Sequence, residues 1–158
     1  MIEVAIADPA WTAALPDAAA LAAAAAEAAL AHAGDPEPGD VAILLADDAA
    51  IQTLNARFRH QDRPTNVLSF PAAAGAQGQA GDVALAYGVC AVEAAAQAKP
   101  LAHHLQHLTV HGVLHLFGFD HQDEAQAANM EGLERRILAG LGVPDPYAAE
   151  RSAEADHV

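Results

Sequence analysis

Three histidines stand close together in the stretch HGVLHLFGFDH, at positions 111, 115 and 121, with Gly118 between the last two. A helix turns by about 100° per residue, so a separation of four residues places His111 and His115 one turn apart on the same face. Gly118 can adopt the left-handed conformation that ends a helix, which would return His121 toward the helix end. Three imidazole nitrogens can therefore meet at one point.

Three neutral imidazoles are the ligand set of catalytic rather than structural zinc sites. Structural sites are closed by four ligands, usually with cysteine among them, whereas three histidines leave one coordination position of Zn²⁺ open for water. The ion lowers the pKa of that water far below its value in bulk solvent, so hydroxide forms near neutral pH. We therefore predict one Zn²⁺ ion held by His111, His115 and His121.

Other polar residues near the motif are candidates for support rather than ligation. His107 shares a predicted helix with the motif and is interpreted as a packed or hydrogen-bonded side chain that supports the site. Asp120 precedes the third histidine and can orient a ligand imidazole or hold a water. Glu131 and Glu134 lie one turn apart on the last predicted helix and are interpreted as solvated surface charges.

Gly112, directly after the first histidine, separates the motif from a protease pattern. The spacing HxxxHxxGxxH is that of the metzincin zinc proteases, but those enzymes carry a glutamate at this position as general base. A glycine cannot accept a proton, and peptide hydrolysis must also deliver a proton to a poor leaving group. A zincin-type hydrolase of peptides is therefore kept only as an alternative.

A cluster of arginines favours a phosphodiester substrate instead. Arg57, Arg59 and Arg63 fall within seven residues, although the whole chain has only seven lysines and arginines and a formal net charge of −14. Phosphodiester cleavage needs a nucleophile and stabilisation of negative charge on the phosphate oxygens, which a metal ion and a planar guanidinium can supply together. Because the total charge opposes nucleic-acid binding, such binding must depend on this local patch.

The elements that position these residues follow from hydrophobic periodicity. Alternation at residues 2–6 and short apolar runs at 41–46, 66–71 and 82–86 predict four strands, the third ending at a sheet edge because of its proline. Residues 72–82 are interpreted as a loop in which Asp82 is a turn residue. Helices are predicted at 18–33, from Asp47 or Asp48 through Phe58, and at 89–98, 101–117 and 124–141.

This order predicts an α+β domain, with a small four-stranded mixed sheet packed with about five helices, one of which carries the metal-site histidines. Residues 1–150 are expected to form one domain and residues 151–158 a frayed tail. The single cysteine, Cys90, fits a reducing compartment, and neither a secretory signal nor a membrane span is recognisable. A cytoplasmic protein without membrane contact is expected.

Longer segments of the sequence resemble the YbeY endoribonuclease family of bacterial rRNA maturation factors. They are LNARFRHQDRPTNVLSFP at 54–71, GDVALA at 81–86 and HLTVHGVLHLFGFDH at 107–121, followed by EAQAANMEGLERRIL and DPY. The resemblance covers nearly all of residues 40–147, while the N-terminal third diverges. It implies a zincin-like α+β fold with one zinc ion on the three histidines named above.

The resemblance also implies an activity and partners. It implies a metal-dependent endoribonuclease specific for single-stranded RNA, which matures the 3′ end of small-subunit rRNA and acts in ribosome quality control. It implies contacts with small-subunit ribosomal proteins or an assembly GTPase, and no nucleotide cofactor. Arg59 matches the arginine that the family pattern places beside the zinc cleft, so a catalytic role on the substrate phosphate carries over to it; Arg57 and Arg63 are further candidates for substrate binding.

One alternative belongs to another functional class. A ribosome-assembly binding protein with a mainly structural zinc would suit the net charge of −14, because attachment to basic ribosomal proteins fits an acidic surface better than capture of bare RNA.

Overall fold

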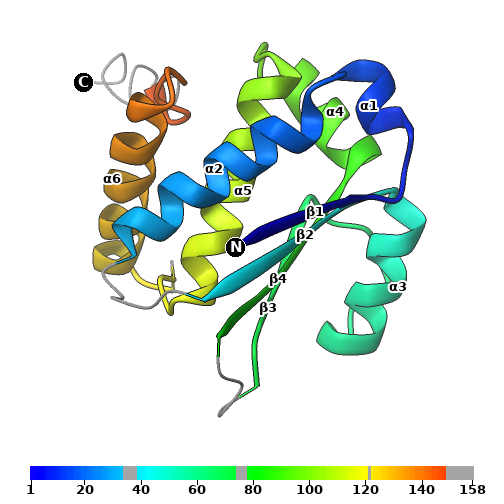
Figure 1. The fold of residues 1–158 in the computed structure, drawn as a ribbon, viewed down its shortest axis with the longest axis horizontal. Helices are drawn as coiled ribbons and strands as arrows, with labels where there is room; N and C mark the ends of the chain where they lie inside the picture. The colour runs from blue at the N-terminus through cyan, green and yellow to red at the C-terminus, as the bar shows by residue number, and fades with distance from the viewer. Residues whose placement is uncertain (34–38, 74–77, 121, 149–158) are drawn as a thin grey trace.

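A four-stranded sheet divides the protein into two sides (Figure 1). The computed structural model describes residues 1–33, 39–73, 78–120 and 122–148. The strands are β1 (Ile2–Ile6), β2 (Asp40–Ala46), β3 (Val67–Pro71) and β4 (Gln79–Ala86), in the spatial order β1-β2-β4-β3. β1, β2 and β4 are parallel, and β3 runs antiparallel to β4 at the sheet edge. The predicted mixed sheet, with Pro71 in an edge strand, is confirmed.

Six helices pack around this sheet in the described residues, one more than predicted. They are α1 (Ala10–Ala14), α2 (Ala18–His32), α3 (Asp48–Arg59), α4 (Tyr87–Ala96), α5 (Leu101–Leu116) and α6 (Glu124–Gly140). The additional helix, α1, is a single short turn that buries Trp11, whose indole N–H donates to the carbonyl oxygen of Ala46 at 3.0 Å. Figure 1 shows α2, α5 and α6 on one side of the sheet and α3 on the other.

The continuous apolar run of β2 is explained by cover on both of its faces. Val41, Ile43 and Leu45 are buried in the core beneath α2 and α5, whereas Leu44 belongs to a smaller cluster with Ile51 of α3. A strand covered on both faces has no solvent side that would call for polar residues. α3 therefore completes the second layer, although it covers only part of its face.

The helix that carries the histidines lies unusually close to the sheet. A Cβ atom at Gly112 of α5 would come 2.7 Å from Val83 Cγ1 and 3.2 Å from both Ser69 Oγ and Val67 Cγ2. At this short distance the Ser69 hydroxyl donates a hydrogen bond to the carbonyl oxygen of Gly112 at 2.8 Å. The glycine thus lets the backbone of α5 rest directly on β3 and β4.

The segment before β4 differs from the prediction. β4 begins at Gln79, so Asp82 lies within a strand, paired with Phe70 of β3 and Ala42 of β2, and is not a turn residue. The sequence pattern does not indicate the start of this strand because glycines are typical of loops, but Gly81 is needed inside the strand: its φ is 146°, and a Cβ there would clash with the carbonyl oxygen of Phe70. Glycine reads as a loop residue in sequence, yet here it permits strand pairing at close range.

The described helices include none with the combination of length and apolar character that a bilayer crossing requires. The tail predicted at 151–158 lies outside the described residues.

Candidate active site

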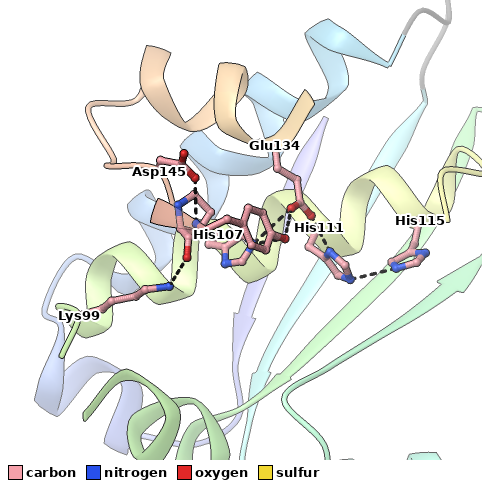
Figure 2. A network of polar contacts seen from close by, with 8 residues as sticks. Lys99, His107, His111, His115, Glu134 and Asp145 are labelled. Atoms are coloured by element: carbon pink, nitrogen blue, oxygen red, sulfur yellow. Dashed lines mark hydrogen bonds and ion pairs between the residues drawn. The ribbon is translucent and has the colours of Figure 1, made fainter. Parts of the chain in front are cut away.

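Two of the three predicted ligand histidines converge at the end of α5. The Nε2 atoms of His111 and His115 lie 3.0 Å apart, and Figure 2 shows these two nitrogens pointing toward each other from rings that are nearly perpendicular. Gly118 has a φ of 89° and its N–H donates to the carbonyl oxygen of His115 at 3.2 Å, so the left-handed helix end is present as predicted. His121 lies outside the described residues.

Glu134 of α6 holds the other side of the His111 ring. Its carboxylate is fully buried, and the Nδ1 atom of His111 lies 2.5 Å from Oε1. His107 Nε2 is 3.4 Å from Oε2, and the Tyr147 hydroxyl donates a short hydrogen bond to the same oxygen (Figure 2). Glu134 is thus the centre of a buried network that joins α5, α6 and the C-terminal segment.

The charge state of Glu134 follows from this network. Burial by itself would raise the pKa of the carboxyl, but the hydrogen bonds from His107 and His111 and the attraction of these rings outweigh it and lower the pKa to about 2. A carboxylate accepts hydrogen bonds and donates none, so His111 carries its proton on Nδ1. With its proton on Nδ1, the neutral form of His111 has its lone pair on Nε2, on the side of His115, and this is the form that binds a metal.

The interpretation of Glu134 as a solvated surface charge is wrong. Glu134 lies on the buried face of α6 with Met130, Leu133, Ile137 and Leu138. The signal was available, because these apolar residues recur at helical spacing and position 134 falls on their stripe. Only the packing of α6 against α5 shows that His111 lies opposite Glu134.

The C-terminal segment is fastened to the same network. Lys99 Nζ donates to the carbonyl oxygen of Pro146 at 2.9 Å, and the Tyr147 N–H donates to the Asp145 carboxylate at 2.8 Å. These contacts place the Tyr147 ring against His107, with ring centroids 5.4 Å apart. His107 therefore supports the network from behind, at one helical turn from His111.

A polar groove of about 610 Å³ opens beside the two histidines. Its wall includes Arg59, Arg63, Asn66 and Asp120. Arg59 Nη2 donates to the carbonyl oxygen of Ser69 at 2.5 Å, which leaves the remaining guanidinium donors for other partners. The groove thus combines imidazole nitrogens with two guanidinium groups.

The third predicted arginine is placed elsewhere. Arg57 is absent from the wall of this groove; it lies over the Phe58 ring at 5.2 Å and lines a shallow hollow with Asp62 on another side of α3. Residues two apart on a helix point in nearly opposite directions, so Arg57 and Arg59 cannot share one groove.

The fold and the site define an α+β protein whose histidine pair, backed by a buried carboxylate, opens into a cationic groove. The family model described as "Endoribonuclease YbeY" matches residues 6–142. The chain is 54% identical over 153 residues to "Endoribonuclease YbeY" of Azorhizobium caulinodans, covering 93% of this chain and 96% of the relative. It is 49% identical over 158 residues to the Paramagnetospirillum magneticum protein of the same name, covering 94% and 96%.

A solved structure shows the same fold. The solution structure of TM1509 from Thermotoga maritima superposes with a TM-score of 0.56 at 23% sequence identity, covering 89% of this chain and 91% of that one. The chain belongs to the YbeY family of endoribonucleases, which are hydrolases. The resemblance seen in the sequence is thereby confirmed.

Proposed function

We propose that this chain is a zinc-dependent endoribonuclease that cleaves single-stranded RNA. The observation that carries the proposal is the convergence of His111 Nε2 and His115 Nε2 at 3.0 Å, with the far side of His111 held by the Glu134 carboxylate. Two nitrogens bound to one tetrahedral zinc at about 2.0–2.1 Å lie roughly 3.3 Å apart, so the pair fits one ion. When bound, Zn²⁺ would supply Lewis-acid activation of water and neutralise charge on the phosphate.

The ligand set requires a further side chain. In the described part of the chain, no three histidine, cysteine or acidic side chains gather in a way that suits a metal. The motif assigns the third position to His121, which follows the left-handed turn at Gly118. Glu134 is assigned the role of orienting His111, since carboxylates commonly hold the second nitrogen of a metal-binding imidazole.

The remaining groups of the groove act on the substrate. Arg59 binds the scissile phosphate and stabilises its developing negative charge, since a guanidinium offers several N–H donors in one plane. Arg63 binds an adjacent phosphate. Asp120, the one carboxylate among the described residues of the groove wall, orients water or a ligand imidazole.

The biological substrate that we propose is the 3′ end of small-subunit rRNA, in ribosome maturation and quality control. The net charge of −14 supports delivery through small-subunit ribosomal proteins or an assembly GTPase, because an acidic body is attracted to basic proteins and repelled by bare RNA. The peptide-hydrolase alternative is disfavoured because position 112 faces β3 and β4 and has no room for a catalytic acid.

Cleavage of a single-stranded rRNA fragment by the zinc-loaded protein tests the nuclease. We expect Arg59→Ala to lower the rate about 10²–10³-fold, as loss of a charge-stabilising donor does, and His115→Ala to lower it at least as far. Arg136→Ala, an exposed arginine on α6, is the matched control and should cleave like wild type. Equal cleavage by all four proteins would identify a contaminating nuclease and refute the assignment.

The acidic charge also favours a second candidate function, an rRNA-processing binding factor in which zinc is mainly structural. The Arg59→Ala variant keeps the zinc ligands, so it separates the two functions in cells that lack the native protein. Restored rRNA processing by this variant would favour the binding factor, and failure to restore it, with normal protein levels, would favour the nuclease.

A further inference from the structure

A second and larger groove lies on the face of the sheet that α3 covers only in part. It measures about 970 Å³ and runs between α3 and the strands. The strand register places Glu3, Ala42, Asp82 and Phe70 in one row across the sheet, and Ala5, Leu44, Ala84 and Leu68 in the next. Because alanines occupy the floor where larger residues would fill the space, the groove stays open.

Aromatic rings form the side of this groove nearest the edge strand. Phe58 of α3 is 53% exposed, and its ring meets that of Phe70 edge-on with centroids 5.4 Å apart. The guanidinium of Arg59 lies 5.6 Å from the centre of the Phe70 ring. A pair of aromatic rings, one exposed and one half-buried beside a guanidinium, is a combination on which single-stranded nucleic acids stack their bases and anchor their phosphates.

The two grooves adjoin at the edge of the sheet and share lining residues. Arg59 and Pro71 line both of them, and Arg59 also donates to the backbone of β3 between them. A chain that places one phosphate on Arg59 beside the histidines can therefore continue over β3 into the second groove.

We propose that this second groove binds the base of a nucleotide next to the cleaved bond, with Phe58 and Phe70 as its aromatic contacts. The proposal rests on the proposed nuclease function and adds a substrate subsite to it. Charge selects the base over the backbone, because Glu3 and Asp82 lie in the groove and would repel a phosphate there. The same carboxylates can accept hydrogen bonds from an exocyclic amino group, as acidic side chains do from cytosine N4.

The test uses a single-stranded RNA with one mapped cut and a series in which each nucleotide near the cut in turn lacks its base. For wild type we expect one such abasic position to raise KM about tenfold, in the range that base stacking on an aromatic side chain gives. Phe58→Ala should raise KM for the intact RNA similarly, with kcat little changed, and the abasic substitution should then add nothing further. Phe58→Tyr, which keeps the ring, should restore KM.

The control is Val92→Ala, which truncates another exposed apolar residue, 70% exposed, on α4. It should leave every KM unchanged. Independent effects of Phe58→Ala and the abasic position, which multiply rather than overlap, would overturn the proposal. An unchanged KM in Phe58→Ala would also overturn the proposal. If that variant instead changed the oligomeric state measured by light scattering, the groove would be a contact with a second copy of the chain.

Failure of the nuclease function is recognised separately, by equal cleavage in wild type and His115→Ala. Binding of a labelled RNA oligomer, measured by fluorescence anisotropy in a chelating buffer that prevents metal-dependent cleavage, then still tests whether the second groove binds a base. Wild type should bind the intact oligomer about tenfold more tightly than the abasic one, and Phe58→Ala should bind both alike. Equal binding of both oligomers by wild type would refute the subsite.

Discussion

A glutamate in place of Gly112 is expected to lower the free energy of unfolding by at least about 4 kcal/mol, because it buries an unpaired carboxylate and overpacks the contact between α5 and the sheet. Even its Cβ atom would lie 2.7 Å from Val83 Cγ1, and the Val83 side chain is fully buried and has no free space into which it could move. The variant would therefore unfold or nearly unfold a domain of ordinary stability rather than acquire a protease base.

Gly112→Ala keeps this prediction testable if the glutamate variant does not fold. Alanine in a helix gains about 1 kcal/mol over glycine, but overpacking typically costs about 2 kcal/mol, so we expect a net loss of about 1 kcal/mol in urea denaturation followed by circular dichroism. The control is Gly132→Ala on α6, where a new Cβ meets nothing closer than an arginine side-chain nitrogen at 3.6 Å. That variant should gain stability. A Gly112→Ala protein as stable as wild type would show that close packing at Gly112 does not determine the distance between α5 and the sheet.

Glu134→Gln is expected to weaken zinc binding about 10–100-fold, the usual effect of removing a carboxylate behind a metal-binding histidine. Glutamine keeps the shape but loses the negative charge, and its amide cannot accept from His111, His107 and Tyr147 as the carboxylate does. The proton of His111 is then no longer held on Nδ1, so its Nε2 lone pair is less available to an ion.

Competition with a chromophoric chelator measures this affinity directly, without RNA. Glu131→Gln, on the same helix but outside the network, is the matched control and should bind zinc like wild type. Unchanged affinity in Glu134→Gln, in a protein with native circular dichroism, would mean that the buried carboxylate serves packing alone. A loss of the same size in both variants would point to long-range charge rather than to the hydrogen bond with His111.

The arginine cluster shows why proximity in sequence predicts a site only in part. The sequence predicts one cationic patch of Arg57, Arg59 and Arg63, yet only the last two line the histidine groove. Arg57 and Arg59 lie in α3 and are separated by 200° around its axis, whereas Arg63 follows the helix and is free of that constraint. Helical geometry could have separated the first two, but which of them faces the histidines depends on how α3 docks on the sheet.

Local sequence patterns predict the four strands, apart from the first residues of β4, and all but the shortest helix. They also predict the edge position of β3 and the shared helix face of His111 and His115. These features follow from periodicity and from glycine or proline at single positions, which act over a few residues of chain. The packing of the helices on the sheet is needed to see that Glu134 is buried behind His111, that Gly112 lets α5 lie close to the sheet, and that alanines leave a groove beneath α3. Each of these joins elements that are distant in sequence, and their side chains meet only when the helices are packed on the sheet.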